Sequence, residues 1–195
     1  MRTVRRRDKW PCLYWLNLYE LAKRLLQPNE VLVTVRYFTA IISSPPSPAD
    51  KQRRQTTYLE ALGTLANVSI HYGVYSTMDR RCPHCNQIAV VPKEKMTDVK
   101  IAVELMTDAF TDAFDTAILV SGDSDLVPPV QAVIALFPEK HVVLASPPAR
   151  VSKALRQTAH EHRRIRRAHL EQSQFPPQVA RADGFTLSRP SEEPV

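Results

Sequence analysis

Long apolar runs are missing from this sequence. No stretch reaches the roughly 18 consecutive apolar residues that a membrane-spanning helix requires. The basic segment 1–9 is not followed by the apolar core of a signal peptide, because Asn17 and Glu20 interrupt the leucine-rich stretch after it. We therefore expect a protein that does not span a membrane and that lies in the cytoplasm.

Cysteine is also scarce, with only Cys12, Cys82 and Cys85. An odd number in a reducing compartment argues against a disulfide framework. The CPHC tetrapeptide at 82–85 supplies two of the four ligands of a tetrahedral zinc site, and His71, His84 and Cys12 are candidates for the others. Structural zinc, a degenerate zinc site and two metal-free thiols all remain open. A thioredoxin-like motif is disfavoured, because this CxxC does not open a helix after a buried strand.

Positive charge and apolar side chains are plentiful. The formal net charge is +6, and 44% of the residues are hydrophobic. A basic protein favours an anionic partner such as nucleic acid, although a merely solvated basic surface fits equally well. One basic cluster occupies residues 1–9, and a second begins with Arg150, Lys153 and Arg156. The second cluster follows a predicted strand, so it either grips a phosphate backbone beside that strand or forms a solvated helix face.

Strand-like and helix-like segments alternate along the chain. We predict helices over 13–26, 51–66, 97–112, 126–137 and 151–159, and strands over 31–38, 68–75, 116–121 and 141–145. This alternation predicts an α/β fold with a mainly parallel sheet. We place one domain at 10–169 with an excursion at about 77–95, preceded by the basic segment 1–9. Residues 170–195 are polar and proline-rich, and we expect them to be irregular.

The segment SGDSD at 121–125 directly follows the apolar run 116–121, which suits a strand covered on both faces. Ligands of open parallel sheets bind beyond the carboxyl ends of the strands, where Asp123 and Asp125 are expected. A structural alternative has Asp125 capping the next helix and Asp123 serving as a turn residue. An EF-hand loop is excluded, because its glycine position falls on Pro128.

Asp98 opens the strongest helical pattern, 97–112, with Thr97 as its expected N-cap. A carboxylate is favoured there by the helix dipole whatever its function. Together with Asp123 and Asp125 it predicts an acidic site at the rim of the sheet. Such carboxylates repel one another unless a cation lies between them, and oxygen ligands suit Mg²⁺ or Mn²⁺. This chemistry indicates metal-assisted hydrolysis of a phosphodiester.

The run EKMTDVKIAVELMTDAFTDAFDTAILVSGDSDLVPPVQAV resembles the core of the NYN domain, in the bacterial LabA-like branch of the PIN-like nuclease superfamily. The resemblance implies a Rossmann-like α/β/α sandwich and metal-dependent cleavage of RNA, with Asp98, Asp123 and Asp125 as catalytic metal ligands. Ser121 and Ser124 would support them, and the basic cluster at 150–156 would bind RNA. The CxxC resembles a short cysteine-bearing insert of this branch.

The sequence departs from this family at its beginning. Relatives open with a strand that ends in an Asp-Gly-x-Asn motif, and nothing before Trp10 resembles it. A missing central strand would leave unpaired backbone groups on its neighbours. The annotated start then lies downstream of the true one, or the protein is a natural fragment with weak or no activity. The alternative to a ribonuclease is therefore a catalytically impaired module that binds RNA or protein. A haloacid-dehalogenase-type phosphatase would need an earlier DxD, which does not occur.

Overall fold

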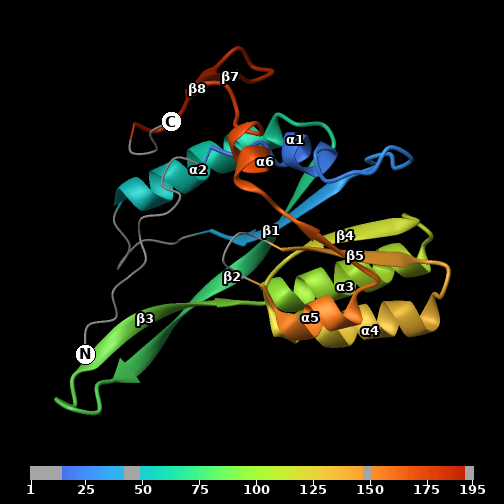
Figure 1. Ribbon diagram of the computed structural model, residues 1–195. Helices are drawn as coiled ribbons and strands as arrows, with labels where there is room; N and C mark the ends of the chain where they lie inside the picture. The colour runs from blue at the N-terminus through green and yellow to red at the C-terminus, as the bar shows by residue number, and fades with distance from the viewer. Residues whose placement is uncertain (1–14, 42–48, 147–150, 192–195) are drawn as a thin grey trace.

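The computed structural model describes residues 15–41, 49–146 and 151–191 (Figure 1). The helices are α1 (Leu18–Lys23), α2 (Ala49–Gly63), α3 (Thr97–Phe110), the 3-10 turn η1 (Ser124–Leu126), α4 (Val127–Leu136), α5 (Lys153–Thr158) and α6 (Arg167–Glu171). The strands are β1 (Val35–Ala40), β2 (Val68–Arg81), β3 (Ile88–Lys95), β4 (Thr116–Val120), β5 (His141–Ser146), β6 (Glu161–Arg164), β7 (Gln178–Ala180) and β8 (Thr186–Ser188). Within the described ranges no helix is long and apolar enough to cross a membrane.

Parallel pairing dominates the two larger sheets. β1 pairs in parallel with β2, and β4, β5 and β6 form a second, wholly parallel sheet. β2 then continues into an antiparallel ladder with β3, and β7 pairs with β8 in a small hairpin. Helices connect the parallel strands, as crossover connections require. The α/β fold with mainly parallel pairing predicted from the sequence is confirmed.

Helix α3 packs across both larger sheets. It contacts β1 and β2, and its side chains also share a buried cluster with α4 and β5. On the opposite face, α2 covers β1 and β2 through Leu62, Tyr37 and Ile70. Leu21 and Leu25 around α1 pack against Ala145 of β5. The sheets are thus held between two helical layers, which is the predicted sandwich.

The two larger sheets do not share a ladder in the described part of the chain. β1 pairs only with β2, and β4 pairs only with β5. Val120 at the end of β4 is 48% exposed, and β4 is only partly buried elsewhere. Both faces of the strand are packed, as expected, with Ile118 against the cluster around α1 and Leu119 against the cluster of α3 and α4. Burial is only partial, because one edge of β4 has no partner among the described residues.

The segment after residue 170 is ordered, which corrects the expected irregular tail over residues 170–191. The Phe175 amide donates to the Trp15 carbonyl at 2.8 Å, and the Trp15 indole donates to the Pro176 carbonyl at 2.8 Å. Val179 of β7 and Leu187 of β8 are buried in the same cluster as Trp15. Polar composition was misleading because a few spaced apolar side chains were enough to dock this segment on α2.

Several element boundaries differ from the sequence-based expectations. The first helix begins at Leu18, capped by Asn17, and the expected residues 13 and 14 lie outside the described chain. Strand β1 begins four residues later than the expected residue 31, and Val31 and Val33 are exposed. β6 and α6 were not predicted, because their short segments are rich in arginine and histidine. The proline pair of α4 lies in its first turn, as expected.

The excursion at 77–95 is a β-hairpin arm, formed by the outer part of β2 and by β3 (Figure 1). Its ladder runs from the pair Val74–Lys95 to the pair Arg81–Ile88. The CPHC tetrapeptide forms the turn at its far end. β3 leads directly into Met96 and α3, so the arm joins the sandwich at the start of that helix.

Candidate functional site

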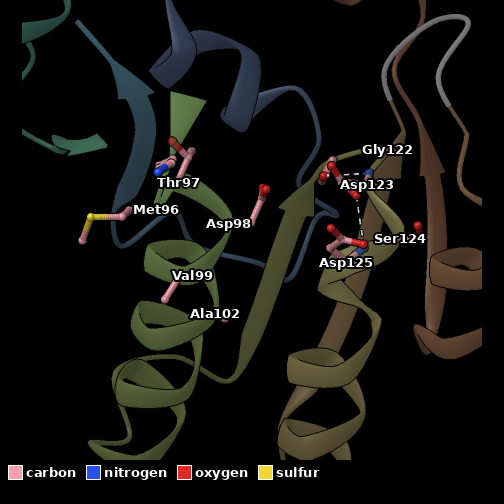
Figure 2. A pocket seen from close by; sticks show the side chains of 11 residues that line it. Met96, Thr97, Asp98, Val99, Ala102, Gly122, Asp123, Ser124 and Asp125 are labelled. Carbon is pink, nitrogen blue, oxygen red and sulfur yellow. Dashed lines mark hydrogen bonds between the residues drawn. The ribbon is translucent and has the colours of Figure 1, made fainter. Parts of the chain in front are cut away.

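A pocket lies where β4 and β3 end (Figure 2). One wall is the start of α3, and the other is the SGDSD turn between β4 and α4. The lining residues are Lys95, Met96, Thr97, Asp98, Val99, Ala102, Ser121, Gly122, Asp123, Ser124 and Asp125. All three aspartates predicted from the sequence therefore line one pocket at the carboxyl end of a parallel strand, the usual place for a ligand in such sheets.

The SGDSD turn is shaped by its own side chains. The Asp123 amide donates to Ser121 Oγ at 3.1 Å, and the Asp125 amide donates to Asp123 Oδ1 at 3.1 Å. Asp123 is therefore the cap of η1, whereas the structural alternative gave the capping role to Asp125. One oxygen of Asp123 is engaged in this cap, and the Asp125 carboxylate is exposed on the turn.

The opposite wall depends on an unusual entry into α3. Met96, not the expected Thr97, is the N-cap, and it has a left-handed φ of 74° with no side-chain cap. A glycine allows β2 to approach this point closely, because a Cβ on Gly73 would lie 2.5 Å from Thr97 Oγ1. Asp98 follows in the first turn of α3 and is exposed. Left-handed non-glycine residues often accompany functional sites, where the surrounding structure holds them.

The donor chemistry of this pocket fits a hard divalent cation. Carboxylate and hydroxyl oxygens are the ligands that Mg²⁺ and Mn²⁺ prefer. Asp98 faces the turn that carries Asp123 and Asp125 across the pocket (Figure 2). Among the residues whose side chains are described, no three acids, histidines or cysteines are close enough to hold a metal together. Mg²⁺ commonly retains several waters and takes only one or two carboxylates directly, so a spacing of this kind suits water-mediated contacts.

The predicted basic cluster divides into different environments. Lys153 and Arg156 are exposed on α5, which packs beside η1. Arg150 lies outside the described residues. Arg163 has a structural role: its guanidinium donates to both oxygens of Glu30, at 2.6 and 2.7 Å, and to Glu161 at 2.8 Å. Lys153 and Arg156 therefore remain available to an anion beside the SGDSD turn.

The sequence reasoning missed one charged lining residue, Lys95. It lies three positions before Asp98, at the end of β3, and is exposed. A lysine preceding an acidic helix start was a usable signal, but the segment was assigned to the excursion. Its ammonium group places a positive charge at the edge of an otherwise acidic pocket.

The cysteines lie far from this pocket along the arm. Cys82 and Cys85 occupy the turn of the hairpin and are free thiols. His71, a sequence-based candidate ligand, is engaged elsewhere: its Nδ1 lies 3.4 Å from Glu104, and its ring stacks on Phe38. Cys12 lies outside the described residues.

Comparison with known proteins identifies similar chains. The family model of the NYN domain matches residues 5–186. The 6-hydroxy-3-succinoylpyridine 3-monooxygenase HspA of Pseudomonas putida is 28% identical in an alignment of 153 residues that covers 62% of this chain and 49% of that protein. The chain thus spans about half the length of this curated relative. A protein of unknown function from Vibrio parahaemolyticus has a similar fold, with a TM-score of 0.51, 23% identity and coverage of 78% of this chain and 80% of that one.

Proposed function

Because the chain belongs to the NYN domain family, whose fold is that of the PIN-like nuclease superfamily, we propose that it is a metal-dependent ribonuclease of the LabA-like branch. The observation that carries this proposal is the pocket in which Asp98, Asp123 and Asp125 lie together at the end of β4. Family membership makes nuclease activity plausible, and the residue set of the pocket supplies a chemical route to it. RNA as substrate and a cytoplasmic location are parts of the proposal.

The three carboxylates would hold Mg²⁺ or Mn²⁺, directly or through water. A bound ion of this kind lowers the pKa of water and offsets the charge of a phosphate. Ser121 fixes the turn by accepting from the Asp123 amide, so both aspartates are presented from a defined backbone. Ser124 is exposed on the same turn and can donate a hydrogen bond to a phosphate oxygen.

Positive side chains on two sides of the pocket would position the RNA backbone. Lys95 lines the pocket itself, and Lys153 and Arg156 lie on α5 beside the turn. Contacts with phosphates orient a nucleic acid without reading its sequence. We therefore expect cleavage of single-stranded RNA with salt-sensitive binding.

Cleavage of a labelled single-stranded RNA, with Mn²⁺ or Mg²⁺ and with or without EDTA, tests this function. Asp125→Asn removes a pocket charge while preserving side-chain shape, so it should fold normally and lose at least about tenfold in rate. Glu139→Gln is the matched control, because Glu139 is exposed in the α4–β5 connection, outside the pocket. Equal cleavage by both variants would refute the assignment of the site.

A module that binds RNA without cutting it is the second candidate. The observation favouring it is the absence of a compact three-acid cluster among the side chains that the structure describes. Salt-sensitive RNA binding without cleavage at any metal concentration would establish this alternative. The Lys153→Ala and Arg156→Ala variants should then lose affinity while leaving the fold unchanged.

A further inference from the structure

The tip of the β2–β3 arm is a preorganised turn. The Cys82 amide donates to the Gln87 carbonyl at 2.8 Å, and the Asn86 amide donates to the Cys82 carbonyl at 3.0 Å. Asn86 adopts a left-handed φ of 56°, a conformation that asparagine tolerates better than most residues. These contacts close the loop around the CPHC tetrapeptide.

Within this turn, backbone N–H groups point at the sulfur atom of Cys82. The amides of His84 and Cys85 hydrogen-bond to Cys82 Sγ, and the Cys85 thiol also contacts it. Both thiols are free, and Cys85 is exposed at the very end of the arm.

Zinc sites closed by protein ligands take four of them, and this turn offers two cysteines at C-x₂-C spacing. No group of three or more His, Cys, Asp or Glu side chains surrounds the turn in the described chain, and the nearest histidine on β2, His71, is bound to Glu104. We propose that Cys82 and Cys85 bind zinc together with the same two cysteines of a second copy of this chain, so that one Zn²⁺ joins two arms tip to tip.

Shape and charge suit this occupant. The tip lies at the end of an arm that extends away from the helical layers, so the described helices leave it open to the tip of a second copy (Figure 1). Four thiols lose four protons on binding, and the resulting Zn(S)₄ centre carries a net charge of −2. Arg80 and Arg81 immediately precede the turn on each chain and offset this charge. Met78 and Ile88, 47% and 59% exposed near the tip, provide apolar surface for the contact.

Zinc content and molar mass of the full chain test the proposal. In reducing buffer with a slight excess of ZnCl₂, followed by desalting, we expect half a zinc per chain and a doubled molar mass in light scattering. Chelation of the metal should restore the monomer. Persistent reductant removes a disulfide-linked dimer from consideration.

Single substitutions test whether Cys82 and Cys85, and not the other candidate residues, are the zinc ligands. Cys82→Ser and Cys85→Ser should each abolish zinc retention and dimerisation, whereas Cys12→Ser and His84→Ala should retain both. With Co²⁺ in place of zinc, the wild-type chain should show the intense visible bands of a tetrahedral thiolate site, and these bands should disappear in Cys85→Ser.

Three outcomes contradict the proposal. A chain that stays monomeric and metal-free with excess zinc has no site at the tip. One zinc per monomeric chain means that ligands within the chain complete the site. Loss of zinc in Cys12→Ser or His84→Ala assigns the third ligand to that residue instead of the second copy. None of these measurements depends on RNA cleavage, so this inference and the proposed ribonuclease fail independently.

Discussion

Gly73 is the residue on which the start of α3 most directly depends. A Cβ at this position would lie 2.5 Å from Thr97 Oγ1 and 3.0 Å from the Lys95 carbonyl, so the wall that carries Asp98 would have to move. We expect Gly73→Ala to lower the free energy of unfolding by about 1–3 kcal/mol, as overpacking does. Chemical denaturation measures the change.

Gly63 provides the matched control for this prediction. It lies at the end of α2 with nothing within 4 Å of an added Cβ, so Gly63→Ala should be neutral or slightly stabilising. Equal stability of the two variants would show that β2 and α3 are not in close contact at Gly73.

Arg163 joins the loop after α1 to β6. It hydrogen-bonds to Glu30 and Glu161, and these bonds hold the pKa of each glutamate below its ordinary value of 4.5. A lowered pKa in the folded state means that the carboxylate form stabilises the fold above pH 4.5, and this stabilisation is lost as the pH falls through the folded-state values.

The corresponding prediction concerns the acid limb of the stability profile. Glu30→Gln should flatten the decline in unfolding free energy below pH 4.5, and at pH 7 it should cost about 1–3 kcal/mol. Urea unfolding between pH 3 and pH 7 measures both effects. The control is Glu20→Gln, because Glu20 forms an exposed ion pair with Lys23. If the pH profile of Glu30→Gln were identical to that of Glu20→Gln, the role of Arg163 would be contradicted.

Among the secondary-structure elements, β1 and α3 are joined by a bidentate ion pair. Arg36 Nε and Nη2 each lie 2.6 Å from an oxygen of Asp108. Both side chains are partly shielded, with 30% and 16% exposure, so the pair is stronger than a surface salt bridge. Asp108→Asn should therefore destabilise the fold by about 1–2 kcal/mol. A double-mutant cycle with Arg36→Met that gives zero coupling would exclude this pair as the link.

Strand edges should differ in hydrogen exchange. β5 has partners on both sides and is buried from Val142 to Ser146, whereas β4 has one partner in the described chain. We expect β4 amides to exchange at least tenfold faster than β5 amides, because a strand with one open edge leaves alternate amides unpaired. Equal protection would show that another segment covers the open edge of β4. Mass spectrometry of peptic peptides gives the comparison.

Sequence periodicity predicted the helix α3, but it does not tell which side of that helix is buried. In α3, Val99, Val103 and Phe110 are exposed, whereas Ile101 and Leu105 pack into the core. Helix α3 has apolar residues on both sides, and periodicity alone does not tell which side meets a sheet. Boundaries of β1 and α1 shifted for a related reason, since exposed valines carry the same signal as buried ones.

For the molecule as a whole, the last described residues are part of the core. Leu187 is 4% exposed and shares a cluster with Phe175 and with Trp15, which lies more than 150 positions earlier in the sequence. Leu187→Ala should cost about 2–5 kcal/mol, as other buried leucine truncations do. Phe185→Ala, at a 60% exposed position, should cost less than about 1 kcal/mol. Thermal denaturation followed by tryptophan fluorescence distinguishes the two.

The site was predictable to the extent that it depends on strand ends. SGDSD follows an apolar strand, and the rule that parallel sheets bind ligands at carboxyl ends predicts Asp123 and Asp125 at this rim, where both line the pocket. Asp98 was placed by the resemblance and by its helix. The left-handed Met96 and the close approach of Gly73 depend on tertiary contacts between β2, β3 and α3, which no local pattern encodes.

The β2–β3 arm is a long hairpin whose base adjoins the pocket. β3 runs from Ile88 to Lys95, about 26 Å at the usual rise of a strand, and the next residues are the wall of the acidic pocket. For a ladder of this length, a small tilt at its base is a displacement of several ångströms at the tip. A fluorophore on Cys85 of the metal-free chain would therefore report tilting of the arm from a point outside the pocket.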